Sequence, residues 1–309
     1  MVSLYTQALP NRKALFKCQW KFILNLITKL VKMLKNKKSF QIMKKRKSKR
    51  VENNSSKKLK LQTNQIILSG KHSILSALKN KNRKLYYLIL TEESSKFWKE
   101  QIQVLNLSLV IKIKTKEELD LITNYQPHQN SILVTEPLVR ISLDEFIFTS
   151  KLRSDLPQRI IILDQVTDPQ NVGAIIRSAY AFNMDGVALS QSNSPTETSS
   201  MAKASSGAIE KIKIIQLSNM SREIKKLQAA NFNVYGLAFG GSKNISELHS
   251  ENGNIAIIVG SEGRGLRRLT KDKVDQLLEI PINKECESLN VANAASIAMF
   301  ELQKNFIKI

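Results

Sequence analysis

The chain has 309 residues, 42% of them hydrophobic, and a formal net charge of +22. This length allows more than one domain with a hydrophobic core, and the composition excludes a chain that is disordered throughout. The two cysteines lie far apart and the three histidines lack ligand spacing. These patterns argue against a disulfide framework, a zinc site and metal catalysis.

Residues 1–65 form a strongly basic extension, which we expect to be largely disordered. They contain 18 Lys and Arg and one acid, Glu52, and so carry +17 of the net charge. Such a segment suits a polyanion, either nucleic acid or an anionic membrane surface, although an AT-rich genome that favours Lys is an equal explanation for much of the excess. The longest apolar stretch, Phe22–Leu34, is interrupted by lysines and shorter than the roughly 18 residues of a spanning helix, so we expect no stable membrane insertion. It fits a targeting helix, a surface helix or a stretch upstream of an alternative start at Met43, and we favour the last of these.

Residues 66–140 are predicted to form a small α/β domain, followed by a linker at 141–157. Short apolar runs that indicate strands alternate with amphipathic runs that indicate helices. The expected strands are Leu85–Leu90, Leu109–Ile113 and Ser131–Val134, and the expected helices are Gly70–Lys79, Ser94–Leu105 and Lys116–Thr123.

A second α/β domain is predicted over residues 158–309. Its strand candidates are short and apolar on both faces, which is typical of buried parallel strands. They are Arg159–Leu163, Gly186–Leu189, Ile212–Ile215, Asn233–Leu237, Ile255–Val259 and Leu277–Ile280. The expected helices between and after them include Ala174–Phe182, Ser221–Ala230 and Val291–Phe306.

The loop after the first of these strands contains polar residues that are not needed for a core. It runs from Asp164 through Asn171 to a helix that opens near Gly173, and backbone amides at such a helix start attract anions. Arg177 lies about one turn after Gly173 on the same side, where a guanidinium can bind phosphate or carboxylate. A capped helix with a surface arginine is an equally good explanation of this segment alone.

Two further loops follow strand ends in the same domain. One is rich in glycine between Gly260 and Gly265, and the other presents Ser288 and Asn290 before the last helix. The glycine spacing is neither that of a dinucleotide fingerprint nor that of a phosphate loop, and a tight turn or a helix cap explains each loop about as well. Because parallel strands end at one edge of a sheet, however, the three loops together predict a common pocket for a nucleotide-like ligand.

In order and spacing, the three loops resemble the three motifs of the SpoU/TrmH family of RNA 2′-O-ribose methyltransferases, which belong to the SPOUT class. The matching residues are Asn171-x-Gly173-Ala-Ile-x-Arg177, Gly260-x-Glu262-Gly-x-Gly265 and Ile280-Pro-Ile followed by Ser288-Leu-Asn290-Val, and the resemblance covers residues 158–309. Residues 66–140 resemble, less specifically, the L30e-like substrate-binding domain of the bacterial 23S rRNA guanosine 2′-O-methyltransferases. That match lies around Ser69–Leu78 and His128–Ile132.

The resemblance implies an α/β fold with a SPOUT-type trefoil knot in the catalytic domain, built from the loops after Leu237, Val259 and Ile280. It implies S-adenosylmethionine as methyl donor, no metal, and a homodimer whose sites use residues of both subunits. The implied donor-binding residues are Ala238, Gly260, Ile280 and Leu289. The implied catalytic residues are Arg177, Asn171, Glu262, Ser288 and Asn290. Because a guanidinium stays protonated, we expect Arg177 to stabilise the developing alkoxide and the adjacent phosphate rather than to act as a base.

The expected substrate is RNA, most specifically a guanosine of 23S rRNA, in the cytoplasm of a bacterium or, as an alternative, in an organelle matrix. The alternatives are a tRNA 2′-O-methyltransferase of the same family and a non-catalytic RNA-binding or ribosome-assembly protein. A nucleotide-binding oxidoreductase would need the GxGxxG fingerprint, which is missing. Two departures from the family pattern are Ala292, where serine is frequent, and Asn130, where glycine is usual.

Overall fold

The computed structural model describes residues 59, 61–151, 157–191, 194–250, 252–283 and 285–304. The expected helix at Phe22–Leu34, the alternative start at Met43 and the basic extension up to residue 58 lie outside these ranges. Residues from Leu59 onward form one unit. Within the described ranges, no helix is both long and apolar enough to cross a bilayer.

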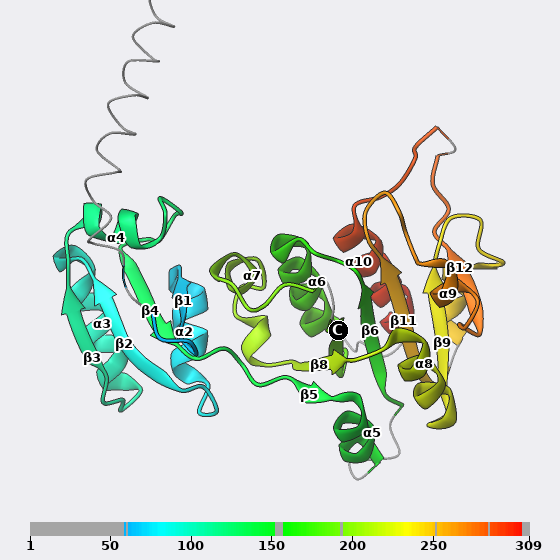
Figure 1. Ribbon diagram of the computed structural model, residues 1–309, viewed down its shortest axis with the longest axis horizontal. Helices are drawn as coiled ribbons and strands as arrows, with labels where there is room; N and C mark the ends of the chain where they lie inside the picture. The colour runs from blue at the N-terminus through cyan, green and yellow to red at the C-terminus, as the bar shows by residue number, and fades with distance from the viewer. Residues whose placement is uncertain are drawn as a thin grey trace, which may run out of the picture. The chain divides into compact units, whose positions relative to one another are not determined.

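The N-terminal part of this unit is a four-stranded sheet with helices packed on it (Figure 1). Its strands have the order β1-β4-β2-β3, with β4 antiparallel to β1 and β2, and β3 parallel to β2. The strands are β1 (Ile66–Ser69), β2 (Leu85–Leu90), β3 (Val110–Ile113) and β4 (Ser131–Thr135), and the helices are α2 (Lys71–Lys79), α3 (Glu92–Val104) and α4 (Lys116–Ile122). Leu68, Leu88, Leu133 and Trp98 lie fully buried in its core.

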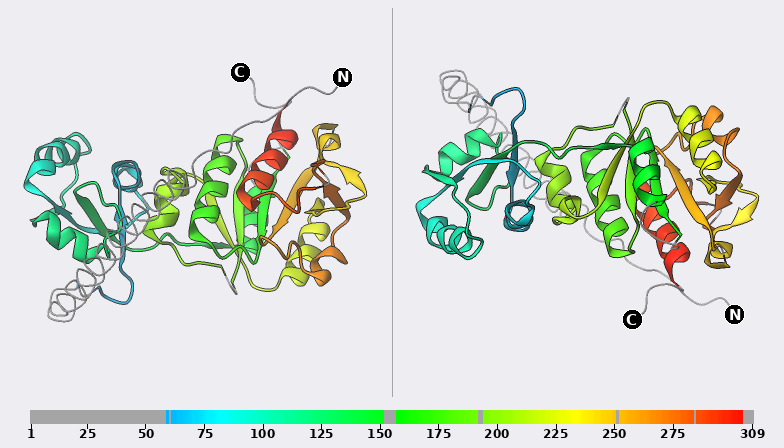
Figure 2. Two further views of the ribbon diagram at one scale, coloured as in Figure 1. Left: turned by 90° about the horizontal axis from the view of Figure 1, so that it is seen from above. Right: turned by 90° about the horizontal axis from the view of Figure 1, so that it is seen from below.

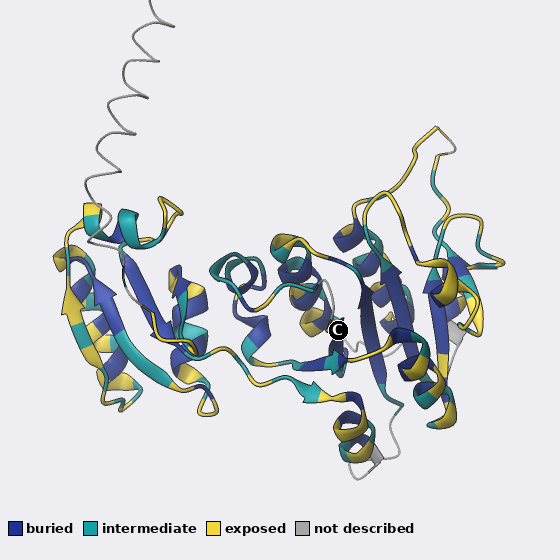
Figure 3. Cartoon of the chain, viewed as in Figure 1, coloured by how far each residue is buried: buried dark blue, intermediate teal, exposed yellow. Residues whose placement is uncertain are grey.

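The C-terminal part is an eight-stranded sheet in which every strand pairing is parallel. The strand order is β10-β12-β9-β11-β6-β7-β8-β5. The strands are β5 (Ile141–Ser142), β6 (Arg159–Asp164), β7 (Gly186–Ser190), β8 (Lys213–Leu217), β9 (Phe232–Leu237), β10 (Lys243–Asn244), β11 (Asn254–Gly260) and β12 (Gln276–Glu279). The central strands are buried along their length, as a sheet covered on both faces requires (Figure 3).

Helices cover both faces of the large sheet and explain why its strands are apolar throughout. One face packs against α6 (Pro169–Ala181), α7 (Ser199–Ala204), η2 (Ala208–Glu210), η3 (Ile245–Ser250) and α10 (Val291–Gln303). The other packs against α5 (Leu143–Lys151) and α8 (Met220–Ala229). A short helix, α9 (Arg268–Lys271), follows the glycine-rich loop. Figure 2 shows α10, in red, beside α6, in agreement with their direct contact.

Two of the stretches that differ from the sequence expectation lie next to β6. The segment 141–157, expected to be a linker, contains β5 and α5, because Phe146 of α5 is fully buried against the sheet and β5 pairs with β8. Helix α6 begins at Pro169 rather than near Ala174. The side chain of Asp168 accepts a hydrogen bond from the Gln170 amide at 3.0 Å, and a proline suits the first turn of a helix.

Candidate active site

The loops after β9, β11 and β12 line one cavity of about 260 Å³. These strands are neighbours in the sheet and parallel, so their carboxyl ends meet at one edge. The cavity is lined by Ala238, Gly260, Ile280 and Leu289, the residues expected to bind the methyl donor. The structure therefore brings together four positions that are up to 51 residues apart in sequence.

The glycine-rich loop folds back on itself at this edge. A methyl group on Gly260 would lie 2.1 Å from the carbonyl carbon of Gly265 and 2.4 Å from the Leu266 nitrogen, so only glycine allows this approach of backbone to backbone. Ser261 and Gly265 form an isolated antiparallel bridge across the turn. The fold-back leaves the main chain of the loop to form one wall of the cavity.

The cavity offers apolar walls with charged groups beside them. Leu237, Val259, Ile280 and Leu289 provide surface for a flat ring, and strand-end backbone groups can donate to or accept from its edge. Glu262, Glu287, Arg264 and Lys271 also line it. This set of groups fits an adenosine joined to a zwitterionic amino acid with a sulfonium charge. Among the described residues, no cluster of His, Cys, Asp or Glu is placed to hold a metal ion.

Three of the predicted catalytic residues meet beside this cavity in a hydrogen-bonded triangle. The Nδ2 atoms of Asn171 and Asn290 donate to Oε1 of Glu262 at 3.0 and 2.6 Å, and Asn290 Nδ2 lies 3.2 Å from Oδ1 of Asn171. Asn290 also caps α10, since its Oδ1 accepts from the amides of Ala292 and Asn293. Each member comes from a different one of the three predicted loops, so the triangle confirms that they converge.

The other two predicted catalytic residues are placed differently. Ser288 is exposed and lines the cavity. Arg177 is exposed on α6, and no hydrogen bond or ion pair joins its side chain to another residue of the described part. Arg177 follows Asn171 by six positions in the helix, which puts the two side chains about 120° apart around the axis and about 9 Å apart along it. Arg177 is thus not part of the triangle within one chain.

A buried carboxylate that sequence reasoning did not single out anchors the far side of the glycine-rich loop. Asp164, at the end of β6, is 1% exposed; it pairs with Nη2 of Arg267 at 2.7 Å and accepts a hydrogen bond from Oγ1 of Thr270 at 2.8 Å. The contacts tie α9 to the strand that precedes α6. An acid at the end of a buried apolar strand is a local sign of a structural or functional role. The residues around Asp164 do not indicate its partners, however, because these lie more than 100 residues away in sequence.

Comparison with known proteins gives consistent matches. Residues 158–300 match the SpoU rRNA Methylase family, and residues 67–139 match the model for RNA 2′-O ribose methyltransferase substrate binding. A Staphylococcus aureus protein named as a TrmH family tRNA/rRNA methyltransferase is 32% identical over 241 residues, which is 76% of this chain and 94% of the relative. A Staphylococcus epidermidis protein with the same name is 31% identical over 244 residues, covering 77% and 95%.

Two solved structures share the fold. The AdoMet-bound rRNA methyltransferase from Sinorhizobium meliloti aligns with a TM-score of 0.66 at 22% identity, over 80% of this chain and 89% of that chain. The SpoU methyltransferase AviRb from Streptomyces viridochromogenes, solved with AdoMet, also gives 0.66, at 18% identity over 78% and 90%. On these matches and on the convergence of its three motifs, the chain belongs to the SpoU/TrmH family of RNA methyltransferases, whose methyl donor is S-adenosylmethionine.

Proposed function

We propose that this protein methylates the 2′-oxygen of a ribose in structured RNA, and that the target is a guanosine of 23S rRNA. The observation that supports the proposal best is the triangle of Asn171, Glu262 and Asn290 beside the cavity that fits the methyl donor. Residues 66–140 would bind RNA and residues 158–309 would carry out the transfer, in agreement with the two family models. The bacterial relatives support a bacterial cytoplasm as the location.

In the proposed reaction the ribose oxygen forms a bond to the methyl carbon, the carbon–sulfur bond breaks with its electron pair left on sulfur, and the hydroxyl proton is released. The triangle and Ser288 would orient the ribose and its phosphate, and such positioning accounts for several kcal/mol of barrier reduction in enzymes. Ala238, Gly260, Ile280 and Leu289 would hold the adenosine. The trefoil knot is part of this proposal, supported by the fact that the loops after β9, β11 and β12 line one cavity.

Arg177 would stabilise the developing alkoxide from the other subunit of a homodimer. Its exposure and its distance around α6 from Asn171 support a role across a subunit boundary. We expect Arg177→Ala to abolish transfer and to leave S-adenosylmethionine binding largely unchanged. A near wild-type methylation rate in this variant would refute the role.

Subunit complementation tests the arrangement directly. Chains carrying Arg177→Ala and chains carrying Glu262→Gln are coexpressed with different affinity tags, and the mixed dimers are isolated on both tags. If Arg177 acts across the boundary, each mixed dimer keeps one intact site and shows about half the wild-type activity, although both parent dimers are inactive. If it acts within its own chain, both sites of the mixed dimer carry a defect and no activity returns.

The substrate is tested with tritiated S-adenosylmethionine and purified total rRNA and total tRNA. Transfer to rRNA, followed by mapping of reverse-transcription stops at low nucleotide concentration, would identify the ribose. A tRNA substrate is the second candidate, because the names of the relatives include both RNA classes. Transfer to tRNA alone would overturn the rRNA assignment, and binding of the donor without transfer to any RNA would favour a non-catalytic protein.

A further inference from the structure

Residues 197–210, here called the bridge segment, pack between helix α6 and the substrate-binding segment (residues 67–139). On the α6 side the packing is very close, because a methyl group on Gly173 would lie 2.5 Å from the Met201 carbonyl oxygen and 2.6 Å from Cβ of Ala204. On the other side, Ala202 lies in the hydrophobic core of the substrate-binding segment. The bridge segment thus touches both the RNA-binding sheet and the helix that carries Asn171 and Arg177.

The bridge segment and the substrate-binding segment meet at a junction where backbone atoms and hydroxyl groups are in close contact. Gly207 has a φ of +84° and lies so close to α2 that a methyl group on it would meet the Ser76 hydroxyl oxygen at 2.0 Å. The hydroxyl groups of Ser69 in β1 and Ser199 in α7 are 2.6 Å apart. At one end of the junction, Lys203 of α7 donates a hydrogen bond to the Pro127 carbonyl oxygen.

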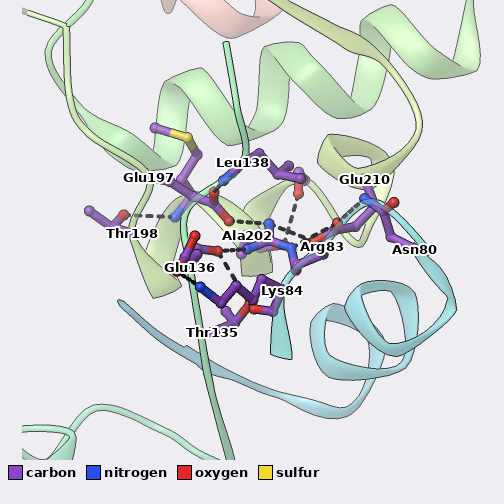
Figure 4. Close-up of polar contacts among 12 residues, drawn as sticks. Asn80, Arg83, Lys84, Thr135, Glu136, Leu138, Glu197, Thr198, Ala202 and Glu210 are labelled. Atoms are coloured by element: carbon purple, nitrogen blue, oxygen red, sulfur yellow. Dashed lines mark hydrogen bonds and ion pairs between the residues drawn. The ribbon is translucent and has the colours of Figure 1, made fainter. Parts of the chain in front are cut away.

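A buried ion cluster closes the junction (Figure 4). Arg83 lies between α2 and β2 with its side chain fully buried; its Nη2 donates to Oε1 of Glu197 at 2.5 Å and lies 2.8 Å from Oε1 of Glu210. Its Nε donates to Oε2 of Glu210 at 3.0 Å, and its Nη1 donates to the Glu136 carbonyl oxygen at 2.8 Å. Asn80 donates to the same Glu210 oxygen at 2.8 Å, and the Leu138 amide donates to Glu197 Oε2 at 2.7 Å.

The cluster fixes orientation more than it adds stability. Moving two carboxylates and a guanidinium out of water costs free energy that cancels much of the gain from their mutual attraction. The same desolvation raises the pKa of Glu197, although the pairing with Arg83 acts in the opposite direction. Apolar contacts between Ala202 and its neighbours tolerate sliding because they are not directional. A planar guanidinium bonded to two carboxylates and a carbonyl oxygen has one geometry, so it sets the angle of the substrate-binding segment.

We propose that Arg83 is a positioning residue for the methyl transfer: through Glu197 and Glu210 it holds the substrate-binding segment in one orientation on the bridge segment, so that bound RNA presents its ribose at the triangle. This inference rests on the proposed function. Arg83 touches neither the donor nor the reacting atoms. It acts on RNA presentation alone, and its loss lowers the fraction of molecules in the competent arrangement.

The first test is the steady-state kinetics of Arg83→Gln, which leaves two buried carboxylates without their guanidinium. RNA that contacts both the substrate-binding segment and the catalytic part binds tightly only to the competent arrangement, and saturating RNA selects that arrangement. If the competent fraction falls to about a tenth, KM for RNA therefore rises about 10-fold, while kcat at saturating RNA changes less than about twofold. The dissociation constant for S-adenosylmethionine stays at the wild-type value. Lys114→Gln is the matched control, because it also removes one positive charge from the substrate-binding segment but breaks only the half-buried pair with Glu118, far from Arg83 in sequence. An equal rise in KM in the control would show that charge alone is responsible and would overturn the proposal.

A reversible lock separates positioning from folding. The double change Ser69→Cys and Ser199→Cys joins two sites whose hydroxyl oxygens are already 2.6 Å apart, so that a disulfide can replace the ion cluster as the constraint. In the Arg83→Gln background, we expect oxidation to restore KM for RNA and dithiothreitol to remove the rescue; peptide mapping confirms the bond. A bond that forms without rescue would overturn the proposal. A wild-type protein that methylates no RNA would contradict the proposed function instead.

Discussion

Replacing Gly260 by alanine tests whether the glycine-rich loop forms the methyl-donor cavity. The added methyl group would lie 2.1 Å from the Gly265 carbonyl carbon, 2.2 Å from its oxygen and 2.4 Å from the Leu266 nitrogen. Carbon atoms pack best at about 3.5–4.0 Å, so the loop must move by roughly 1 Å or more. Overpacking of this kind costs about 1–3 kcal/mol, which corresponds to a loss of about 5- to 150-fold in affinity if the cost falls on the bound state.

The assay is isothermal titration of S-adenosylmethionine, with thermal unfolding measured in parallel. Gly253→Ala is the matched control, because a methyl group at this glycine just before β11 comes no closer than 3.8 Å to another side chain. We expect the control to bind the donor within about twofold of the wild type, since no neighbour has to move. If Gly260→Ala also binds the donor with wild-type affinity and unfolds at the wild-type temperature, the loop is not a wall of the donor site.

Three further changes address the site and the junction. Glu262→Gln keeps an oxygen that accepts from both asparagine amides but removes the charge. The rate of RNA methylation should therefore fall about 100-fold, while the unfolding temperature stays unchanged. A wild-type rate would refute this. Asp164→Asn loses the charge partner of Arg267 and should lower the unfolding free energy in urea by about 1–3 kcal/mol, whereas an unchanged midpoint would contradict its anchoring role. Burial raises the pKa of Glu197 above its ordinary value of 4.5, so the folded state binds the proton more tightly than the unfolded state. The free energy of unfolding therefore falls as the pH rises from 4.5 through the raised pKa. Glu197→Gln should flatten this slope when urea unfolding is measured at a series of pH values upward from 4.5, and the same slope in the variant and the wild type would contradict the assignment.

The sequence predicted the central strands of the large sheet well, for a physical reason. Strands buried on both faces must be apolar throughout, and runs such as Ile255–Val259 show that requirement directly. The parallel arrangement places the loops after β9, β11 and β12 at one edge, where Ala238 and Leu289 line one cavity. The assignment of these two residues to one site came from the family resemblance and not from the strand pattern. The resemblance to a family supplied their chemistry, which periodicity alone does not contain.

The bridge segment was missed because its packing uses few large side chains. Helix α7 has the sequence Ser-Ser-Met-Ala-Lys-Ala, which shows no amphipathic period, and it is held by glycine and alanine contacts to α6 and to the substrate-binding segment. Arg83 pairs with acids 114 and 127 residues away. No local pattern marks Arg83 as buried, since both of its acidic partners lie in the bridge segment.

The separation between the two parts of the molecule bears on how substrate choice arises. Every described contact of the triangle is made within the C-terminal part, by residues that a methyl donor and any ribose would need alike. Discrimination between RNAs must therefore depend on what the substrate-binding segment recognises and on the angle at which it presents that RNA. Because Arg83 and the bridge segment set this angle, changes there should alter which RNA is methylated before they alter whether the donor binds. Changes at Gly260 should have the opposite effect: they should weaken binding of the methyl donor and so lower methylation of every RNA by the same factor.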